Sequence, residues 1–434
     1  MIKKSKVKYF KSDNKDFKSS LKKHLYKRKK NYTSIKSRVS KILSDIKKTG
    51  DMSLIKMVNK YDGNKVEKLN DLKIHFKQLK EAFDDLPLSH KEALKFASKR
   101  IKLFHEKQIP ISFEFKDKLG VKLGLQYTCI NNVGFYVPAG RALYPSSVLM
   151  NAIPADVAGV KKRILVSPIS LNDKPQIIFA AAFLAEVTDF FVIGGAHAIG
   201  ALAYGTKTIP RVDKIFGPGN SYVAEAKRQV FGDAGIDSIA GPSEILVVSD
   251  NKNNPEWIAY DLLSQSEHDE DAQAILITDD FKFAKEVELT IENILKNLPR
   301  RTIASKSWYE NGAIILIDTI SNSHELINYI APEHLQLTID NPAKMLKKIE
   351  NAGSVFLGRY TPESIGDYVA GPNHVLPTLG SARFSSGLGV SDFFKRTTFI
   401  ECNKNNFLKL SKHASVLAEL EGLDAHKFSM KVRE

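Results

Sequence analysis

The sequence predicts an α/β fold with two doubly wound, incomplete Rossmann-like parallel-sheet domains. Short runs rich in Val, Ile and Phe alternate with helical stretches of about 10–15 residues, which is the pattern of βαβ units. This alternation begins at Val133 and resumes after Pro255. The chain has 434 residues, too many for one ordinary core, so two or more domains are expected.

Four parts follow from these patterns. Residues 1–31 are lysine-rich and are expected to form a helical N-terminal arm. A first α/β domain combines 32–135 with 245–388, and a second, 136–244, is inserted between these two pieces. Residues 389–434 form a small C-terminal domain, because the pattern there becomes shorter-ranged.

The elements can be predicted in order along the chain. From Tyr32 to Lys107 apolar residues recur at helical spacing, with breaks near Gly63 and before Pro87, and a hairpin-like passage is centred on Gly120. The expected strands that follow are RILVSP, DFFVIGG, DKIFGPGN, SEILVVSD, AQAILIT, GAIILID, HLQLTI and SVFLG. Helices are expected between them, and LKLSKHASVLAELEG is the last helix before the tail LDAHKF.

Composition restricts the class of protein. No apolar run approaches the ~18 residues of a membrane span, and the N-terminus lacks the apolar core of a signal peptide. Two cysteines, Cys129 and Cys402, are too few for a disulfide framework or a Cys-rich zinc site. We therefore expect a cytoplasmic protein without a membrane partner.

The formal charge of +15 raises the alternative of a nucleic-acid-binding protein. Most of the excess is lysine spread along the chain, and neither zinc-finger spacing nor an RNA-binding aromatic motif accompanies it. A solvated lysine-rich surface is therefore favoured, and no nucleic-acid partner is expected. Salt-sensitive binding of DNA or RNA would support the alternative.

The densest group of reactive side chains is ESIGDYVAGPNHVLPT, residues 363–378. It combines Glu363, Asp367 and His374 with a Gly-Pro turn, so metal-binding or proton-transferring groups sit on sharply turning backbone. A lone Asp or His would usually be a solvated surface residue. A turn-rich run between apolar segments is where scaffolds usually carry function, which favours a site loop.

A second motif, FGPGNSYVAEAK, joins a strand to a helix. Gly217 and Gly219 fit a dinucleotide-binding turn, but Tyr222 occupies the place of the third glycine. A tight strand–helix turn and a nucleotide site are equally compatible with this motif alone. Backbone N–H groups near Asn220 could hold a phosphate or a ribose.

Three further pairs carry candidate chemistry. Gln265 and His268 lie three apart on a helix and share a face, although Gln is an uncommon zinc ligand. Adjacent Glu333 and His334, at a helix–strand junction, could divide acid–base work. The last pair, Glu421 and His426, lies near the C-terminus. Each pair alone is more typical of an ordinary polar surface.

Together these motifs resemble the histidinol dehydrogenase family. The matching segments run in order from roughly residue 30 to the C-terminus: GFYVPAGRALYPSSVLMNAIPADVAG, GGAHAIGALAYGT, KIFGPGNSYVAEAKRQVFG, IAGPSEILVVSD, DLLSQSEH, YIAPEHLQL, GDYVAGPNHVLPT and ELEGLDAHK. The resemblance implies a zinc- and NAD-dependent enzyme. It would oxidise L-histidinol to L-histidine through L-histidinal, with two NAD⁺, at the last step of histidine biosynthesis.

The resemblance also implies roles for individual residues. The implied zinc ligands are Gln265, His268, Asp367 and His426. The implied substrate pocket contains these four together with Ser243, His334, His374 and Glu421. The implied NAD contacts are Tyr136, Asn220 and His197, the last standing where the family usually has Gln. The family forms homodimers, in which the C-terminal segment completes the site of the partner.

The mechanism expected from the resemblance divides the work of the acid–base pair. His334 would remove the alcohol proton during the first oxidation, and Glu333 would activate water for the second. A thiohemiacetal route is disfavoured because Cys129 and Cys402 lie outside every site motif. Two other enzymes stay open: a paralogue acting on another amino alcohol or sulfonated alcohol, and a zinc hydrolase without NAD.

Overall fold

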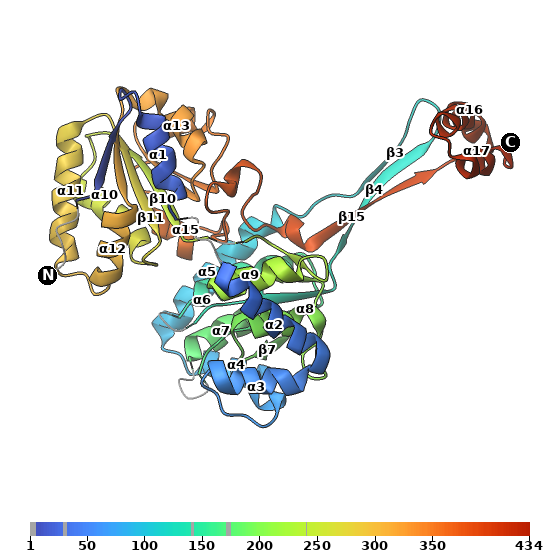
Figure 1. The fold of residues 1–434 in the computed structure, drawn as a ribbon, viewed down its shortest axis with the longest axis horizontal. Coiled ribbons are helices and arrows are strands. Elements are labelled where there is room, and N and C mark those ends of the chain that lie inside the picture. Colours follow the sequence, from blue (N-terminus) through green and yellow to red (C-terminus); the bar gives the residue numbers. More distant parts are fainter. Residues whose placement is uncertain (1–5, 29–32, 140–142, 171–174, 240) are drawn as a thin grey trace.

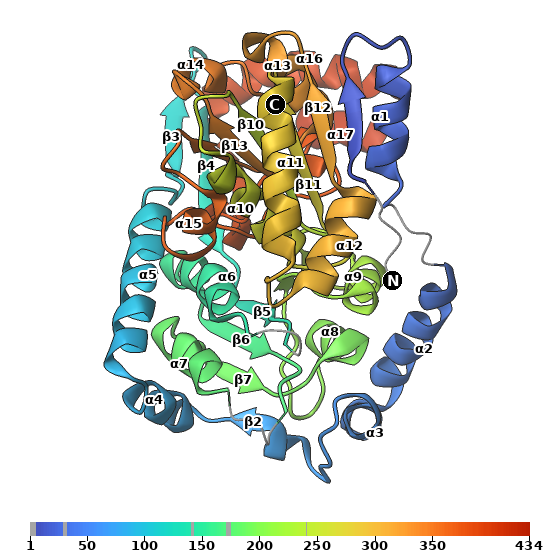
Figure 2. The same cartoon turned by 90° about the vertical axis from the view of Figure 1, so that its left-hand side faces the viewer.

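The computed structural model describes residues 6–28, 33–139, 143–170, 175–239 and 241–434. Two six-stranded sheets lie one above the other, and a long arm projects from one side of the molecule (Figures 1 and 2). Within the described ranges, no helix has the length and apolar character needed to cross a membrane. The two sheets confirm the predicted α/β class with parallel-sheet domains.

The first sheet, called here the β5 sheet, has β5 near its centre. Its strand pairs are parallel except for the antiparallel pair of β2 with β7. Its order is β2 (Lys73–Ile74), β7 (Asp189–Phe191), β6 (Lys162–Val166), β5 (Asn132–Tyr136), β8 (Lys214–Phe216), β9 (Gly235–Ile236). The helices between these strands are α6 (Pro145–Val157), α7 (Gln176–Leu184), α8 (Gly195–Tyr204) and α9 (Ser221–Val230).

The second sheet, called here the β10 sheet, is parallel throughout. Its order is β1 (Lys8–Lys11), β12 (Ala313–Leu316), β11 (Gln273–Thr278), β10 (Glu244–Ser249), β13 (His334–Thr338), β14 (Ser354–Leu357). Its helices are α1 (Phe17–Tyr26), α10 (Pro255–Ser266), α11 (Phe281–Leu295), α12 (Arg301–Asn311), α13 (Ser323–Ile330), α14 (Pro342–Leu346) and α15 (Glu363–Tyr368). Short 3₁₀ turns lie at Leu69–Leu72, Ile320–Asn322, Ser381–Arg383 and Val390–Phe393.

Two of the predicted domain boundaries differ from the structure. Residues 32–135 were expected with 245–388, but their helices surround the β5 sheet (Figure 2) and share its core, as Val39 and Ile101 pack in one cluster with Phe135. These helices are α2 (Thr33–Thr49), α3 (Asp51–Tyr61), α4 (Phe76–Asp84) and α5 (Leu88–Glu106). An amphipathic pattern shows that a helix covers an apolar surface, but it does not show which sheet provides that surface.

The predicted N-terminal arm is part of the β10 sheet. Strand β1 pairs with β12 at the edge, and α1 buries Phe17 and Leu21 in the core beneath the sheet. A turn signal, Ser12–Asn14, follows β1, but the partner strand lies far along the chain, with Ala313 opposite Lys8. The pairing could therefore not be predicted from local pattern.

The C-terminal arm is a further departure from the prediction. It consists of the antiparallel strands β3 (Phe113–Lys116), β4 (Lys122–Cys129) and β15 (Phe394–Glu401), followed by α16 (Lys404–Leu420) and α17 (Asp424–Lys431). The predicted hairpin around Gly120 is confirmed, and residues 394–434 share this arm with it, whereas Val390 and Phe393 are buried in the core of the β5 sheet. The two last helices lie at its far end, away from both sheets (Figure 1).

Opposite edges of the two sheets are joined by α6 and the 363–378 loop. Strand β5 ends at Tyr136, whereas β13 begins at His334. The Asn373 side-chain amide donates to the carbonyl oxygen of Met150 on α6, over 2.6 Å. The carboxyl edge of the β5 sheet and the amino edge of the β10 sheet are therefore tied together by these elements.

Candidate active site

His334 is a buried, neutral base at the first position of β13. Its Nδ1 lies 2.9 Å from the backbone oxygen of Glu244, which can only accept, so Nδ1 carries the proton. The other ring nitrogen, Nε2, lies 3.7 Å from Glu363 Oε1 and 3.8 Å from Asp367 Oδ1. Burial lowers the pKa of His334, against the opposing effect of Asp367. The ring is therefore ready to take a proton at Nε2.

Glu333 is buried beside this ring. Its Oε2 accepts the backbone N–H of Glu244 at 2.7 Å and lies 3.7 Å from His334 Nδ1. Burial, followed by the negative charge of Glu244, raises the pKa of Glu333 well above the usual range of a glutamate. The same burial therefore raises the pKa of Glu333 and lowers the pKa of His334. A carboxyl group with a raised pKa is a stronger base once it is ionised.

Helix α15 directs two carboxyl groups towards His334. Glu363 and Asp367 are four residues apart on the helix and therefore share a face. Gly366 lets the helix approach β14, because a Cβ at this position would lie 2.4 Å from the Phe356 ring. The predicted site loop thus begins with a turn of helix that carries acids into the interior.

Glu363 belongs to the predicted site loop, but it is not among the residues for which the resemblance implies an individual role. It is 2% exposed, and its Oε1 is one of the buried oxygens without a hydrogen-bond partner in the described structure. Burial and the charge of Asp367 raise the pKa of Glu363 to about 9. Burial also opposes ionisation of Asp367, but His374 and His334 outweigh it and lower the pKa of Asp367. The i, i+4 spacing of the two acids was the signal that could have found Glu363.

The side chains gathered here fit a divalent metal such as zinc. Within the described part of the chain, His334, Glu363 and Asp367 form a group whose ligand atoms all lie within 4.8 Å of one another. Gln265, in the last turn of α10, is buried, and its Oε1 lacks a hydrogen-bond partner among the described residues. A buried oxygen without a hydrogen-bond partner is available as a metal ligand.

His268 and His374 complete the group that one chain provides. Burial lowers the pKa of His268, while the charge of Asp367 acts in the opposite direction, which places the two side chains near each other. His374 Nδ1 lies 3.0 Å from the backbone oxygen of Asp367, and its Nε2 lies 3.4 Å from Ser147 Oγ on α6. Of the four implied zinc ligands, His268 and Asp367 thus act on each other, and Gln265 lies on α10, which contacts α15.

Three of the implied substrate residues are not part of this group of side chains. Ser243 directly precedes β10, and its carbonyl oxygen accepts the N–H of Gln273 at 2.9 Å. Glu421 and His426 are exposed, at the end of α16 and on α17 respectively. Because those helices lie at the far end of the C-terminal arm (Figure 1), a chain does not bring them to its own site.

The implied cofactor contacts lie at the carboxyl edge of the β5 sheet. Tyr136 ends β5, its hydroxyl accepts the N–H of Gly195 at 3.2 Å, and burial raises its pKa to about 12. Asn220 caps α9 by accepting the N–H groups of Tyr222 and Val223, at 3.0 and 3.2 Å. Gly217 has φ +102°, and a Cβ there would lie 2.1 Å from the Tyr136 carbonyl oxygen, so this turn requires glycine.

His197 contacts Asp62, a partner that the sequence did not indicate. Its ring is buried on α8, and Nε2 lies 2.9 Å from Asp62 Oδ2. The same carboxylate oxygen accepts the N–H of Gly194 at 3.0 Å. The imidazole therefore ties the start of α8 to the end of α3.

Comparisons with known proteins agree with one another. The model of the family described as histidinol dehydrogenase matches residues 25–434. Histidinol dehydrogenase 1 of Nostoc sp. is 50% identical over 425 residues, which is 98% of this chain and 97% of that protein. The enzyme of Hydrogenovibrio crunogenus is 50% identical over 92% of each chain. The crystal structure of histidinol dehydrogenase from Elizabethkingia anophelis has a TM-score of 0.92 and 35% identity, over 98% of each chain.

We predict that Glu333→Gln stabilises the metal-free protein at neutral pH, by about 1–3 kcal/mol. Below pH of about 4 the carboxyl group is protonated in both the folded and the unfolded chain. As the pH rises, the unfolded carboxyl ionises while the folded one keeps its proton, because its pKa is raised. The wild-type free energy of unfolding therefore falls relative to that of the variant as the pH increases.

Urea unfolding of the metal-free proteins between pH 4 and 8 measures this difference. The exposed Glu350→Gln change removes the same charge from the surface and should show no comparable gain. A gain for Glu333→Gln that shrinks as the pH rises would contradict the prediction.

Proposed function

This chain belongs to the histidinol dehydrogenase family, and from that membership we propose that it oxidises L-histidinol to L-histidine through L-histidinal, with two NAD⁺. The reaction is the last step of histidine biosynthesis. The observation that carries the proposal is the buried pair of Glu333 and His334, which supplies two bases of different kinds at one point. An alcohol oxidation followed by an aldehyde oxidation requires two such proton transfers.

We propose zinc as the metal of this site. Gln265, His268 and Asp367 of one chain would hold it, together with His426. When bound, zinc would orient the amino group and imidazole of the substrate and stabilise developing negative charge. The unpartnered Gln265 Oε1 and the grouping around Asp367 support this assignment. Glu363, beside the same group, would face the bound substrate.

In the first oxidation His334 accepts the hydroxyl proton of histidinol at Nε2. The carbinol carbon loses its hydrogen with both bonding electrons to the nicotinamide, which leaves the aldehyde. The hydrogen bond from Nδ1 to the Glu244 carbonyl oxygen fixes the ring orientation during this transfer. The imidazolium that forms lies within 4 Å of the ionised Asp367 carboxylate, which stabilises its charge, and of the Glu363 carboxyl group.

In the second oxidation the ionised form of Glu333 takes a proton from a water molecule. The water oxygen bonds to the aldehyde carbon and gives the anion of the hydrate. This carbon then loses a second hydride to NAD⁺, which leaves the carboxylic acid, and the acid releases its proton to solvent as the carboxylate. A thiol intermediate is disfavoured because Cys129 lies at the end of β4 and Cys402 follows β15, both on the C-terminal arm. The raised pKa of Glu333 makes its carboxylate a stronger base towards water than an ordinary one.

The cofactor would lie across the carboxyl edge of the β5 sheet. Tyr136 and Asn220 stand there, and the N-terminus of α9 offers a favourable position for a phosphate. His197 has Nε2 bonded to Asp62, so a contact with the cofactor would have to use Nδ1. The Ser147–His374 contact connects this side of the site to the metal side.

We also propose a homodimer in which each chain completes the site of the other. Glu421 and His426 are exposed at the end of an arm that carries exposed apolar residues, among them Leu420 at 79%. One chain supplies only Gln265, His268 and Asp367 of the four implied zinc ligands, so the second imidazole is lacking. His426 from the arm of a second chain would supply it.

Purified protein loaded with zinc should form two NADH per L-histidinol when the substrate is limiting. Chelation should abolish turnover, and added zinc should restore it, because the metal holds the substrate. Absorbance of reduced nicotinamide measures both. A yield of one NADH would mean that the reaction stops at the aldehyde, and no NADH would favour a paralogue acting on another amino or sulfonated alcohol, which a substrate panel would identify.

We expect Glu333→Gln to slow the oxidation of histidinal more than that of histidinol, by about 10²-fold or more, because only the second step needs an activated water. His334→Asn should slow the first step strongly. Stopped-flow kinetics started from histidinol and from histidinal separate the two rates. If Glu333→Gln slowed the oxidation of histidinol and that of histidinal equally, the proposed division of roles between Glu333 and His334 would be wrong.

Mixing two inactive variants, His334→Ala and His426→Ala, should restore activity after joint unfolding and refolding. One site of each mixed dimer then combines an intact His334 with an intact His426 from the other chain. Random pairing gives about a quarter of the wild-type activity. Activity that stays at the level of the separate variants would show that each chain builds its site alone.

A further inference from the structure

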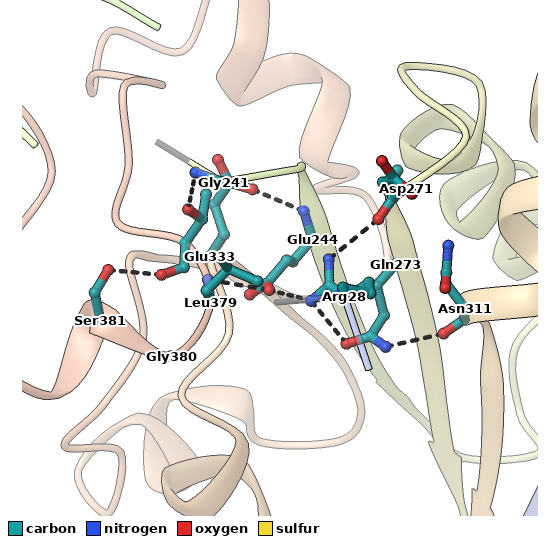
Figure 3. A network of polar contacts seen from close by, with 12 residues as sticks. Arg28, Gly241, Glu244, Asp271, Gln273, Asn311, Glu333, Leu379, Gly380 and Ser381 are labelled. Carbon is teal, nitrogen blue, oxygen red and sulfur yellow. Dashed lines mark hydrogen bonds and ion pairs between the residues drawn. The ribbon is translucent and has the colours of Figure 1, made fainter. Parts of the chain in front are cut away.

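A buried arginine from the N-terminal segment reaches the amino edge of the β10 sheet (Figure 3). Arg28 follows α1 by two residues and is 5% exposed. Its Nη2 donates to the carboxylate of Glu244 and, over 3.1 Å, to Gln273 Oε1, while Nη1 donates to the backbone oxygen of Asp271 at 3.3 Å. An arginine is rarely buried to this degree unless its charge is paired, so these contacts hold the segment in place.

Glu244 connects this network to the proposed bases, Glu333 and His334. Its backbone N–H donates to Glu333 Oε2, and its backbone oxygen accepts from His334 Nδ1. The N–H and the C=O of one residue therefore orient both bases. The Glu244 side chain is held from two sides, by Arg28 and by the backbone N–H of Leu379 at 3.1 Å.

The same arginine also connects the neighbouring strand. Gln273, the β11 residue opposite Glu244, donates from Nε2 to the backbone oxygen of Asn311 at 2.9 Å. Its backbone N–H donates to Ser243, directly before Glu244. Arg28 thus joins the starts of β10 and β11, on which the position of the Glu244 peptide depends.

The charge of Arg28 is needed as well as its hydrogen bonds. Glu244 and Glu333 are both buried, and the carboxyl groups of Glu363 and Asp367 and the ring of His334 face Glu333 from α15 and β13. Arg28 gives Glu244 a positive partner in this acidic surrounding. Without it the Glu244 carboxylate would have to take a proton or move towards solvent, because an unpaired buried charge is strongly unfavourable.

We propose that Arg28 is a positioning residue for the oxidation chemistry: by holding the Glu244 carboxylate, it fixes the backbone N–H and C=O that orient Glu333 and His334. The inference rests on the proposed role of that pair. It gives the basic segment before residue 31 a function inside the protein.

The test compares four variants. Arg28→Met removes the charge and the donors, Arg28→Lys keeps the charge, and Arg28→Met combined with Glu244→Gln removes both charges of the pair. Lys73→Met is the control, because it breaks the Lys73–Asp189 ion pair of 2.7 Å at the far edge of the β5 sheet. Zinc content, thermal midpoint, KM for histidinol and the rates of both oxidation steps are measured for each.

Arg28→Met should lower kcat about tenfold, with KM for histidinol changed less than about twofold, because the substrate-holding groups stay in place. Arg28→Lys should retain most of the rate, and the double variant should recover to within about threefold of wild type. Lys73→Met should lower the thermal midpoint without lowering kcat. If Arg28→Met does not fold, the double variant and Arg28→Lys carry the test.

The inference is overturned if Arg28→Met keeps the wild-type kcat, if the double variant is as slow as the single one, or if Lys73→Met shows the same loss of kcat. Failure of the proposed function is distinguishable, since wild-type protein would then form no NADH from histidinol. In that case the positioning role is read from amide exchange of residues 243–245, which should become faster in Arg28→Met and stay unchanged in Lys73→Met.

Discussion

The active site depends on one peptide position, Glu244, where β10 begins between β11 and β13. Because parallel pairing places Ile245 opposite His334, the preceding residue lies beside both bases of the site. Glu244 is the first residue of the strand, and its N–H and C=O bond to side chains instead of to the backbone of a neighbouring strand. Glu333 and His334 accept and donate at these two groups, so their positions follow from strand register rather than from flexible side-chain packing.

Burial then gives neighbouring groups different protonation behaviour. The environment that keeps a proton on Glu333 removes one from His334, because low polarity disfavours the charged form of each. Asp367 stays ionised since imidazole groups face it, whereas Glu363, one turn earlier on the same helix, holds its proton. One helix therefore presents an ionised acid and a protonated acid to the same ring, which would allow a metal ligand and a hydrogen-bond donor to coexist there.

Local pattern predicted most strands and helices of both sheets and the reactive loop, because alternation and helical spacing reflect burial within a few residues. It did not predict β1 or α12. It placed both Glu363 and Asp367 in the reactive loop, but the proximity of Glu363 to His334 becomes visible only when α15 meets β13. The pairing of β1 with β12, the packing of α2–α5 on the β5 sheet, and the Arg28–Glu244 contact join residues far apart in sequence. No local pattern specifies such contacts, since each depends on which of several compatible surfaces is nearest after folding.

The two sheet edges that meet at the site differ in backbone polarity, and this difference suits their proposed ligands. At the carboxyl edge of the β5 sheet, α9 begins beside Asn220, where the positive end of a helix favours phosphate groups. At the amino edge of the β10 sheet, α10 ends beside Gln265 and His268, where the negative end favours a cation. Placing a carboxyl edge against an amino edge therefore sets an anion-binding surface opposite a cation-binding one. The cofactor would then lie on the carboxyl edge of the β5 sheet and the metal-held substrate on the amino edge of the β10 sheet, so that the two face each other.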